Sequence, residues 1–330
     1  MGISRTGLGL GLLAASALVA GHGVLAQQLP SECRTTALRQ CLLSADRQLC
    51  VLGAMQGMPD SCRKAISARA ASRAGALPAG WREDAYGPDP LQKVDWVAPP
   101  GVRKAPLVLF VHGGGWSIGD KRMDAGKKGA HFVGEGWAFA SANYRLVPQA
   151  TVEQQAQDVA SAIAWARRQP DVDPDRIVLM GHSAGAHLAA LVGTDPTYLK
   201  AAGVPLSAVQ GVVLLDGAGY DVAQQMAAPR NPVQSMYVQA FGSDRARQEA
   251  LSPTRHAAAP NASNWLILPV ERRADSVAQS QELAAKLKAA GATVQVVPQP
   301  AKTHMTLNRE LGDAGDPSTV VVDRFLAGLR

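Results

Sequence analysis

The sequence predicts an α/β fold, with a mostly parallel central sheet that helices cover on both faces. Short, unbroken apolar runs alternate along the chain with longer amphipathic stretches, which is typical of buried strands joined by helices. Of the 330 residues, 47% are hydrophobic and 18% are charged, and these proportions favour a packed globular protein over a disordered or fibrous one. No repeat of fixed period is visible, so a solenoid is not expected.

The predicted elements follow in order from residue 106. Unbroken or nearly unbroken apolar runs predict strands at 106–111, 136–142, 176–180, 211–215 and 265–270, and a last, more polar strand is predicted at 293–297. Apolar residues spaced three and four apart, and a stop at Gly291, predict helices at 151–169, 186–192, 276–290 and 319–329. The stretch 221–261 departs from this alternation. Because a long insertion over the carboxyl edge of a sheet is often a lid, we expect a short lid there.

The N-terminal segment predicts export. Arg5 is followed by an uncharged run from Gly7 to Ala20 and by small residues that end at Ala26, which is the layout of a secretory signal peptide over residues 1–26. The apolar run is shorter than the about 20 residues of a membrane span, and an uncleaved anchor is the alternative. We therefore expect a periplasmic or secreted protein without stable membrane association after removal of the signal.

All four cysteines fall in the next segment, residues 27–75, which we expect to be helical. An even number of clustered cysteines in an exported chain predicts two disulfides. Four cysteines allow three pairings, and the resemblance of the segment to a helical hairpin favours a nested one. In that pairing the disulfide Cys33–Cys62 encloses the disulfide Cys41–Cys50. A zinc site with four thiolate ligands is the alternative, but the closely spaced cysteine pairs of zinc ribbons are missing.

Two glycine motifs follow predicted strands. Gly181-His182-Ser183-Ala184-Gly185 comes directly after the strand 176–180 and opens a helix. A serine on such a sharp strand-to-helix turn holds its hydroxyl above the sheet edge, so Ser183 is the candidate nucleophile; a structural turn without catalysis is the alternative. His112-Gly113-Gly114-Gly115-Trp116 follows the strand 106–111. Its glycines let backbone N–H groups approach a substrate oxygen, whereas the Gly-Lys-Ser/Thr of a phosphate-binding Walker loop is missing.

These motifs resemble the α/β-hydrolase superfamily, in particular its HGGxW esterases: carboxylesterases, feruloyl- and acetyl-esterase-like enzymes and kynurenine formamidases. The resemblance begins near Tyr86 and implies an α/β-hydrolase catalytic domain over 81–330. It implies an oxyanion hole formed by the N–H groups of Gly114, Gly115 and Ala184. It also implies the chain order Ser, Asp, His for a catalytic triad. Trp116 and His182 are weaker candidates for the substrate pocket.

The resemblance places the base in the loop after the last strand. His304 lies in that loop and is the predicted base. His256, in the insertion, and His187, on the helix after Ser183, are the alternatives; His187 is expected to be structural.

The resemblance places the acid after the strand 265–270, where the family has the motif His-Gly-x-x-Asp between a strand and a helix. The His-Gly pair is missing here, and Asp275 stands directly before the predicted helix 276–290. Asp275 is therefore the predicted acid, although a carboxylate at that place also caps helices. Glu271 and Asp216 are the alternatives, and Asp216 is interpreted as a structural carboxylate at a strand end.

The expected function is that of an exported serine hydrolase that cleaves carboxylic esters through an acyl-enzyme intermediate, without cofactor or metal. Its expected partner is a small-molecule or polymer-linked ester. With 33 basic and 27 acidic residues the net charge is +6, and no basic block carries interleaved aromatic residues, so nucleic-acid binding is not expected. An amide-type hydrolase (arylformamidase or peptidase-like) on the same fold is one alternative, and a non-catalytic binding protein is another. No motif specifies the acyl group or the oligomeric state.

Overall fold

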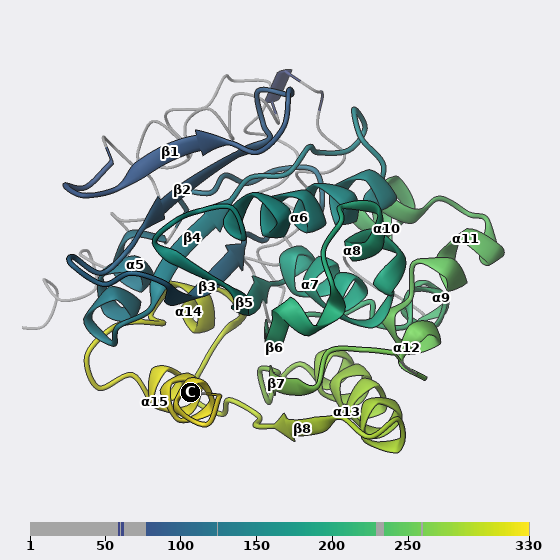
Figure 1. Cartoon of the computed structure of the whole chain (residues 1–330). Coiled ribbons are helices and arrows are strands. Elements are labelled where there is room, and N and C mark those ends of the chain that lie inside the picture. The colour runs from purple at the N-terminus through teal and green to yellow at the C-terminus, as the bar shows by residue number, and fades with distance from the viewer. Residues whose placement is uncertain are drawn as a thin grey trace, which may run out of the picture.

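The computed structural model describes residues 59, 61–62, 77–123, 125–228, 234–258 and 260–329. Within this part of the chain, one eight-stranded sheet has the order β1-β2-β4-β3-β5-β6-β7-β8 (Figure 1). The strands are β1 Arg82–Ala85, β2 Lys93–Val97, β3 Ala105–Val111, β4 Ala138–Ala142, β5 Val172–His182, β6 Val209–Leu215, β7 Asn264–Leu268 and β8 Thr293–Val296. From β4 to β8 all neighbours pair in parallel. The predicted α/β fold with a mostly parallel sheet is confirmed.

Helices lie on both faces of the sheet (Figure 1). They are α5 Ala125–Gly134, α6 Val152–Ala166, α7 Ala184–Thr194, α8 Pro196–Ala201, η2 Leu206–Ala208, α9 Val222–Ala227, α10 Gln234–Phe241, α11 Arg245–Ala250, α12 Pro253–His256, α13 Ala274–Ala289, α14 His304–Arg309 and α15 Pro317–Ala327. Residues of α6, α7 and α13 join one apolar core, and residues of α5, α14 and α15 join the other.

Strand β3 shows why the central runs are apolar without interruption. Leu107 and Leu109 belong to the core beneath α6 and α7, whereas Val108 and Phe110 belong to the core beneath α5 and α15. Successive side chains of a strand point to opposite faces. Both faces are covered, so every position along the strand must be apolar.

The first two strands were not expected. β1 pairs with β2, and β2 with β4, in antiparallel fashion at one edge of the sheet. The sequence of β1 is charged, and its Glu83 forms ion pairs with Lys93 at 2.9 Å and with the buried Lys121 at 2.8 Å. An edge strand held by ion pairs lacks the apolar run by which the other strands were predicted.

The insertion expected at 221–261 contains the four helices α9 to α12 in its described part, on one side of the molecule (Figure 1). Met236 and Tyr237 of α10 are buried in the core that also holds α6 and α7. The insertion therefore packs against the domain, and its role as a lid stays a prediction.

The signal segment 1–26 lies outside the described residues, as do three of the four cysteines; Cys62 is described and buried. The disulfide pairing and the division into domains stay predictions. No helix in the described part of the chain has both the length and the apolar character needed to cross a bilayer.

Candidate active site

Ser183 occupies a strained turn between β5 and α7. Its backbone has φ +56° and ψ −120°, a conformation that costs a non-glycine residue about 1–3 kcal/mol and that is concentrated at functional sites. The flanking glycines are required by space. A Cβ on Gly181 would lie 2.2 Å from the carbonyl oxygen of Gly185, and a Cβ on Gly185 would lie 2.2 Å from that of Val111. The turn therefore has the geometry expected of a nucleophile elbow.

The glycine-rich loop after β3 lies against this turn. A Cβ on Gly113 would lie 2.9 Å from His182 Nδ1 and 3.0 Å from the Cβ of Ser183, so a side chain here would force the loop or the turn to shift. The loop is held from behind, because the Tyr144 hydroxyl donates to the carbonyl oxygen of His112 at 3.0 Å and the Gln155 amide donates to that of Trp116 at 2.7 Å. The loop and the N-terminus of α7 thus meet beside Ser183.

His304 begins helix α14 and is paired with a carboxylate. Its Nδ1 lies 2.7 Å from Oδ2 of Asp216, and the two side chains are 1% and 0% exposed. Asp216 directly follows β6, and its Oδ1 accepts the backbone N–H of Val270 at 2.9 Å. Burial by itself raises the pKa of Asp216, but the charge of Arg273 and the hydrogen bond from His304 outweigh burial and hold that pKa far below its usual range. Asp216 is therefore a carboxylate.

The predicted contact between Asp275 and His304 is not the one that the structure contains. Asp275 lies in the first turn of α13, its side chain is 42% exposed, and its carboxylate accepts hydrogen bonds from Arg273 Nη2 at 3.0 Å and Gln225 Nε2 at 3.5 Å. The loop after β7 instead supports Asp216 through the Val270 N–H. Glu271, the other alternative, is exposed.

Asp216 was interpreted from the sequence as a structural carboxylate at a strand end, and the strand that it follows is what separates it from Asp275. β6 is the direct neighbour of β5, whereas β7 lies one strand further away. Neighbouring strands are about 4.8 Å apart, so a residue at the end of β6 starts closer to the nucleophile than one at the end of β7. The order of strands in the sheet was the missing information.

Arg273 is a site residue that the sequence reading missed. It directly precedes α13, and its side chain is 10% exposed. Its Nη1 donates to Asp216 Oδ2 at 2.8 Å and lies 3.1 Å from His304 Nδ1. Burial opposes the charged guanidinium, but the negative charges of Asp216 and Asp275 raise the pKa of Arg273 above its usual value.

The remaining histidines have other roles. His182 does not line the pocket where it was expected; it is buried, its Nε2–H donates to the carbonyl oxygen of His304 at 2.8 Å, and the two rings are 4.6 Å apart. Burial lowers the pKa of His182 well below its usual range. His187 bonds the carbonyl oxygen of Leu251, and His256 bonds that of Ala250. His304 is the histidine paired with Asp216.

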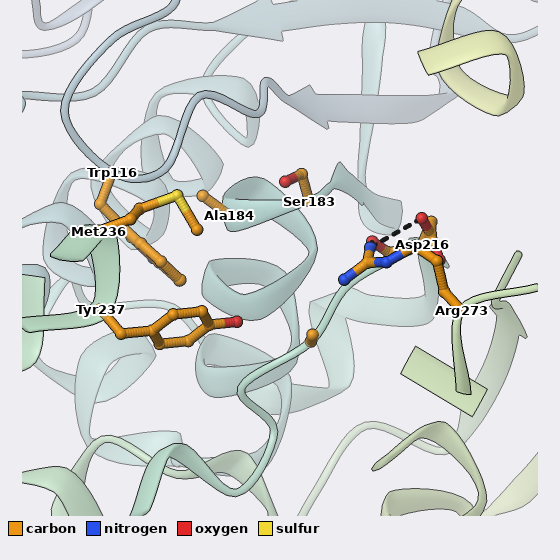
Figure 2. Close-up of a pocket in the computed structure, with 8 residues that line it drawn as sticks. Trp116, Ser183, Ala184, Asp216, Met236, Tyr237 and Arg273 are labelled. Carbon is orange, nitrogen blue, oxygen red and sulfur yellow. Dashed lines mark hydrogen bonds and ion pairs between the residues drawn. The ribbon is translucent and has the colours of Figure 1, made fainter. Parts of the chain in front are cut away.

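Figure 2 shows the pocket around Ser183. Its space amounts to about 280 Å³, open solvent included. One side is apolar and the other carries the Asp216–Arg273 pair, with Ser183 between them. The lining residues are Trp116, Ser183, Ala184, Asp216, Ala218, Met236, Tyr237 and Arg273.

Strained backbone is concentrated at this pocket. Four described non-glycine residues have positive φ, and three of them line it: Trp116 at +61°, Ser183 at +56° and Asp216 at +44°. The fourth is Lys104 at +55°. The three strained residues follow three neighbouring strands, β3, β5 and β6, so the edge of the sheet fixes their mutual placement.

This edge of the sheet carries the residue types that a covalent hydrolase uses. Ser183 and Asp216 line the pocket, and the buried imidazole of His304 is paired with Asp216. The Ser183 hydroxyl and His304 Nε2 are not hydrogen-bonded here, and Nε2 is buried with no hydrogen-bond partner among the described residues. Such bonds often form only once substrate is bound. Within the described ranges, no three His, Cys, Asp or Glu side chains group closely enough to hold a metal ion.

Solved structures define the fold class. The chain is similar to the carboxylesterase EstE1, cloned from a metagenomic library, with a TM-score of 0.64, 21% identity and coverage of 83% of this chain and 97% of that chain. It is also similar to esterase B from Lactobacillus Rhamnosis (HN001), with a TM-score of 0.63, 22% identity and coverage of 82% and 94%. The fold is the α/β-hydrolase fold, as the resemblance implied.

Residues 95–287 match the BD-FAE family. The match spans more than half of the chain, and the chain therefore belongs to the BD-FAE family.

Curated relatives match over shorter stretches. Esterase LipC of Mycobacterium tuberculosis is 37% identical over 121 residues, which are 34% of this chain and 30% of that protein. Esterase LipQ of the same organism is 45% identical over 95 residues, which are 28% of this chain and 22% of that protein. A probable isoprenylcysteine alpha-carbonyl methylesterase of Oryza sativa subsp. japonica is 37% identical over 109 residues, 32% of this chain and 26% of that protein. The chain matches less than a third of the length of each relative.

Proposed function

We propose that this protein is a serine hydrolase that cleaves carboxylic esters, with Ser183 as nucleophile, His304 as base and Asp216 as the acid of the triad. The observation that carries the proposal is the 2.7 Å hydrogen bond between His304 Nδ1 and Asp216 Oδ2 at the pocket that Ser183 lines. A carboxylate only accepts hydrogen bonds, so the imidazole proton lies on Nδ1 and Nε2 is left as an acceptor. An unprotonated Nε2 is what a base for the serine hydroxyl requires.

The reaction follows from these positions. His304 Nε2 takes the proton of Ser183 as its oxygen attacks the ester carbonyl carbon, and the imidazolium then gives that proton to the departing alcohol. Water enters, loses a proton to Nε2, and attacks the acyl-enzyme; the proton returns to Ser183 as the carboxylic acid leaves. Asp216 keeps the ring oriented and stabilises its charged form.

The oxyanion hole is assigned to the backbone N–H groups of Gly114, Gly115 and Ala184. Two observations support this part of the proposal. Gly113 brings the glycine loop to within contact distance of Ser183, and Ala184 opens α7 and lines the pocket. A helix N-terminus favours negative charge, which here would develop on the carbonyl oxygen of the substrate.

The pocket favours a short acyl group. Its apolar wall of Trp116, Met236 and Tyr237 suits a hydrocarbon chain, and these three large side chains leave little room for a long one. Curated relatives that match part of the chain are named esterases, which supports an ester rather than an amide as the substrate.

Export belongs to the proposal as well. The layout of residues 1–26 supports removal of a signal peptide near Ala26 and a periplasmic or secreted location. N-terminal sequencing of the protein recovered from the periplasm or medium tests it; an uncut N-terminus would contradict the proposal.

A fluorophosphonate probe tests the catalytic assignment. The wild type should be labelled at Ser183 and should hydrolyse p-nitrophenyl acetate and butyrate faster than the octanoate. Ser183→Ala should lose labelling and turnover while keeping its unfolding midpoint. Ser207→Ala, which changes an exposed serine of η2, is the matched control and should behave as the wild type. Appreciable turnover by the Ser183→Ala variant would overturn the proposal.

A further inference from the structure

Arg273 lies two residues before Asp275, where the resemblance places the catalytic acid, and it carries the opposite charge. It lies between β7 and α13, in the loop that the triad acid was expected to occupy. Its side chain reaches into the pocket that Ser183 lines (Figure 2) and is 10% exposed. A buried cation at this point needs an explanation, because removing such a group from water is costly unless it is paired.

The pairing of Arg273 involves the triad directly. Nη1 donates to Asp216 Oδ2 at 2.8 Å, the same oxygen that accepts His304 Nδ1–H at 2.7 Å. Nη1 and Nδ1 are themselves 3.1 Å apart. A guanidinium nitrogen only donates, so the two nitrogens lie side by side as donors to one oxygen. Arg273 thereby fixes the carboxylate on which the orientation of His304 depends.

The same contact acts on the charge of His304. A neutral imidazole tolerates a guanidinium at 3.1 Å, but an imidazolium would face a like charge at that distance. Arg273 also neutralises part of the negative charge of Asp216, which is the group that stabilises the imidazolium. Both effects have the same sign, because each disfavours a positive charge on the imidazole ring.

The other groups around this contact do not cancel that effect. Burial keeps His182 uncharged by lowering its pKa well below the usual range, and burial raises the pKa values of Tyr220 and Tyr237, so these two stay neutral as well. The charged groups that face His304, Asp216 and Arg273 from the neighbouring elements are each other, Asp275 and, beyond His182, Lys128. Asp275 is 42% exposed and is screened by solvent.

We propose that Arg273 is a positioning residue that holds Asp216 and places a positive charge 3.1 Å from His304 Nδ1, so that the enzyme stays active at lower pH than the same triad would without it. The proposal rests on the proposed function. The two carboxylates that Arg273 bonds already offset its charge, so it is not assigned to the recognition of an anionic substrate.

The pH dependence of kcat/KM for p-nitrophenyl acetate, followed from pH 4 to pH 9, tests the inference. In Arg273→Met the acidic limb should move to higher pH by about 1 unit or more, with activity at pH 8 reduced but measurable. Arg273→Lys keeps the charge, so its limb should move by less than half as much. Arg272→Met changes an exposed neighbour and should leave the limb in place. A folded Arg273→Met variant whose limb coincides with that of the wild type would overturn the inference.

Asp275→Asn gives a second test that does not depend on the folding of the Arg273 variants. It leaves Arg273 in place and removes an exposed carboxylate that offsets its charge. The acidic limb should therefore move to lower pH, by a few tenths of a unit at low ionic strength. A shift to higher pH would contradict the inference. The proposed function fails separately: it is overturned if Ser183→Ala keeps its turnover, whatever the pH profiles show.

Discussion

Replacing Asp216 by Asn should remove nearly all activity, whereas replacing Asp275 by Asn should not. All three side-chain contacts of Asp216 come from donors: Val270 N–H at Oδ1, and Arg273 Nη1 and His304 Nδ1 at Oδ2. An amide must direct its NH2 group at one of these two sides. If the NH2 faces His304, the ring must carry its proton on Nε2 and can no longer accept the proton of Ser183. If it faces Val270, it meets that N–H as a second donor, and the uncharged amide no longer stabilises the imidazolium.

The size of the effect follows from that change of tautomer. Loss of the correct tautomer lowers kcat of a serine triad by about 10⁴, which corresponds to about 5.5 kcal/mol of transition-state stabilisation. We therefore expect a loss of about 10³–10⁴ for Asp216→Asn. Asp275 is 42% exposed and bonds Arg273 and Gln225, so Asp275→Asn should change kcat at pH 8 by less than about fivefold, as expected for an exposed ion pair.

The assay is steady-state hydrolysis of p-nitrophenyl butyrate at pH 8, normalised to the folded fraction. That normalisation matters because removal of one partner of a buried ion pair costs about 3–5 kcal/mol of stability, and Arg273 would keep only its exposed partner. Circular dichroism at the assay temperature gives the folded fraction. The assignment of Asp216 would be refuted if Asp275→Asn lost a thousandfold while folded Asp216→Asn stayed within tenfold of the wild type.

Three further outcomes are expected. Gly185→Ala should lower the free energy of unfolding in urea by about 3 kcal/mol or more, because its Cβ would lie 2.2 Å from the carbonyl oxygen of Val111. Gly134→Ala, whose Cβ meets nothing within 4 Å, should raise it by about 0.5–1 kcal/mol. Equal effects of the two substitutions would contradict this interpretation. Trp116→Ala should raise kcat/KM for the octanoate ester relative to the butyrate by about tenfold, since the indole closes the apolar side of the pocket; an unchanged ratio would place the acyl chain elsewhere. Burial lowers the pKa of His187 to about 4, so as pH falls from about 6.5 to about 4 the unfolded chain takes up a proton that the folded chain does not, and the free energy of unfolding drops by about 1.36 kcal/mol per pH unit. Above this window His187 contributes no slope. His187→Phe should remove this slope between about pH 4 and pH 6.5, so parallel curves of stability against pH for the variant and the wild type would argue against a neutral buried His187.

Much of the sheet was predictable because burial on both faces leaves a plain mark in the sequence. The runs predicted for β3, β6 and β7 are apolar throughout and the one for β5 is apolar after Arg176, and the predicted bounds differ from the observed ones by a few residues. Strand β1 was not predicted, because a charged, solvent-facing edge strand such as Arg82–Ala85 has no apolar run. Strand β2 was not predicted either, because the buried Asp95 interrupts its short sequence Lys-Val-Asp-Trp-Val. Helix α14 was missed as well, since its six residues are too few to show a period.

The site was predictable where local sequence sets local geometry. Gly181 and Gly185 are demanded by contacts within the turn and its neighbouring strand, so the motif around Ser183 could be read directly. Asp216 could not be told from Asp275 in this way, because the choice depends on which strand ends beside β5. Chain order allows both residues, and only the three-dimensional order β5-β6-β7 separates them.

The strained residues around the pocket set a limit on how this protein can be made more stable. A left-handed conformation costs a non-glycine residue about 1–2 kcal/mol, so glycine substitutions at all four positive-φ positions would relieve the backbone. At Lys104, which is exposed and away from the pocket, that relief comes without loss of function. At Trp116, Ser183 and Asp216 it would remove side chains that line the pocket. Thermostabilisation of this enzyme therefore has to leave the strain at its sheet edge in place.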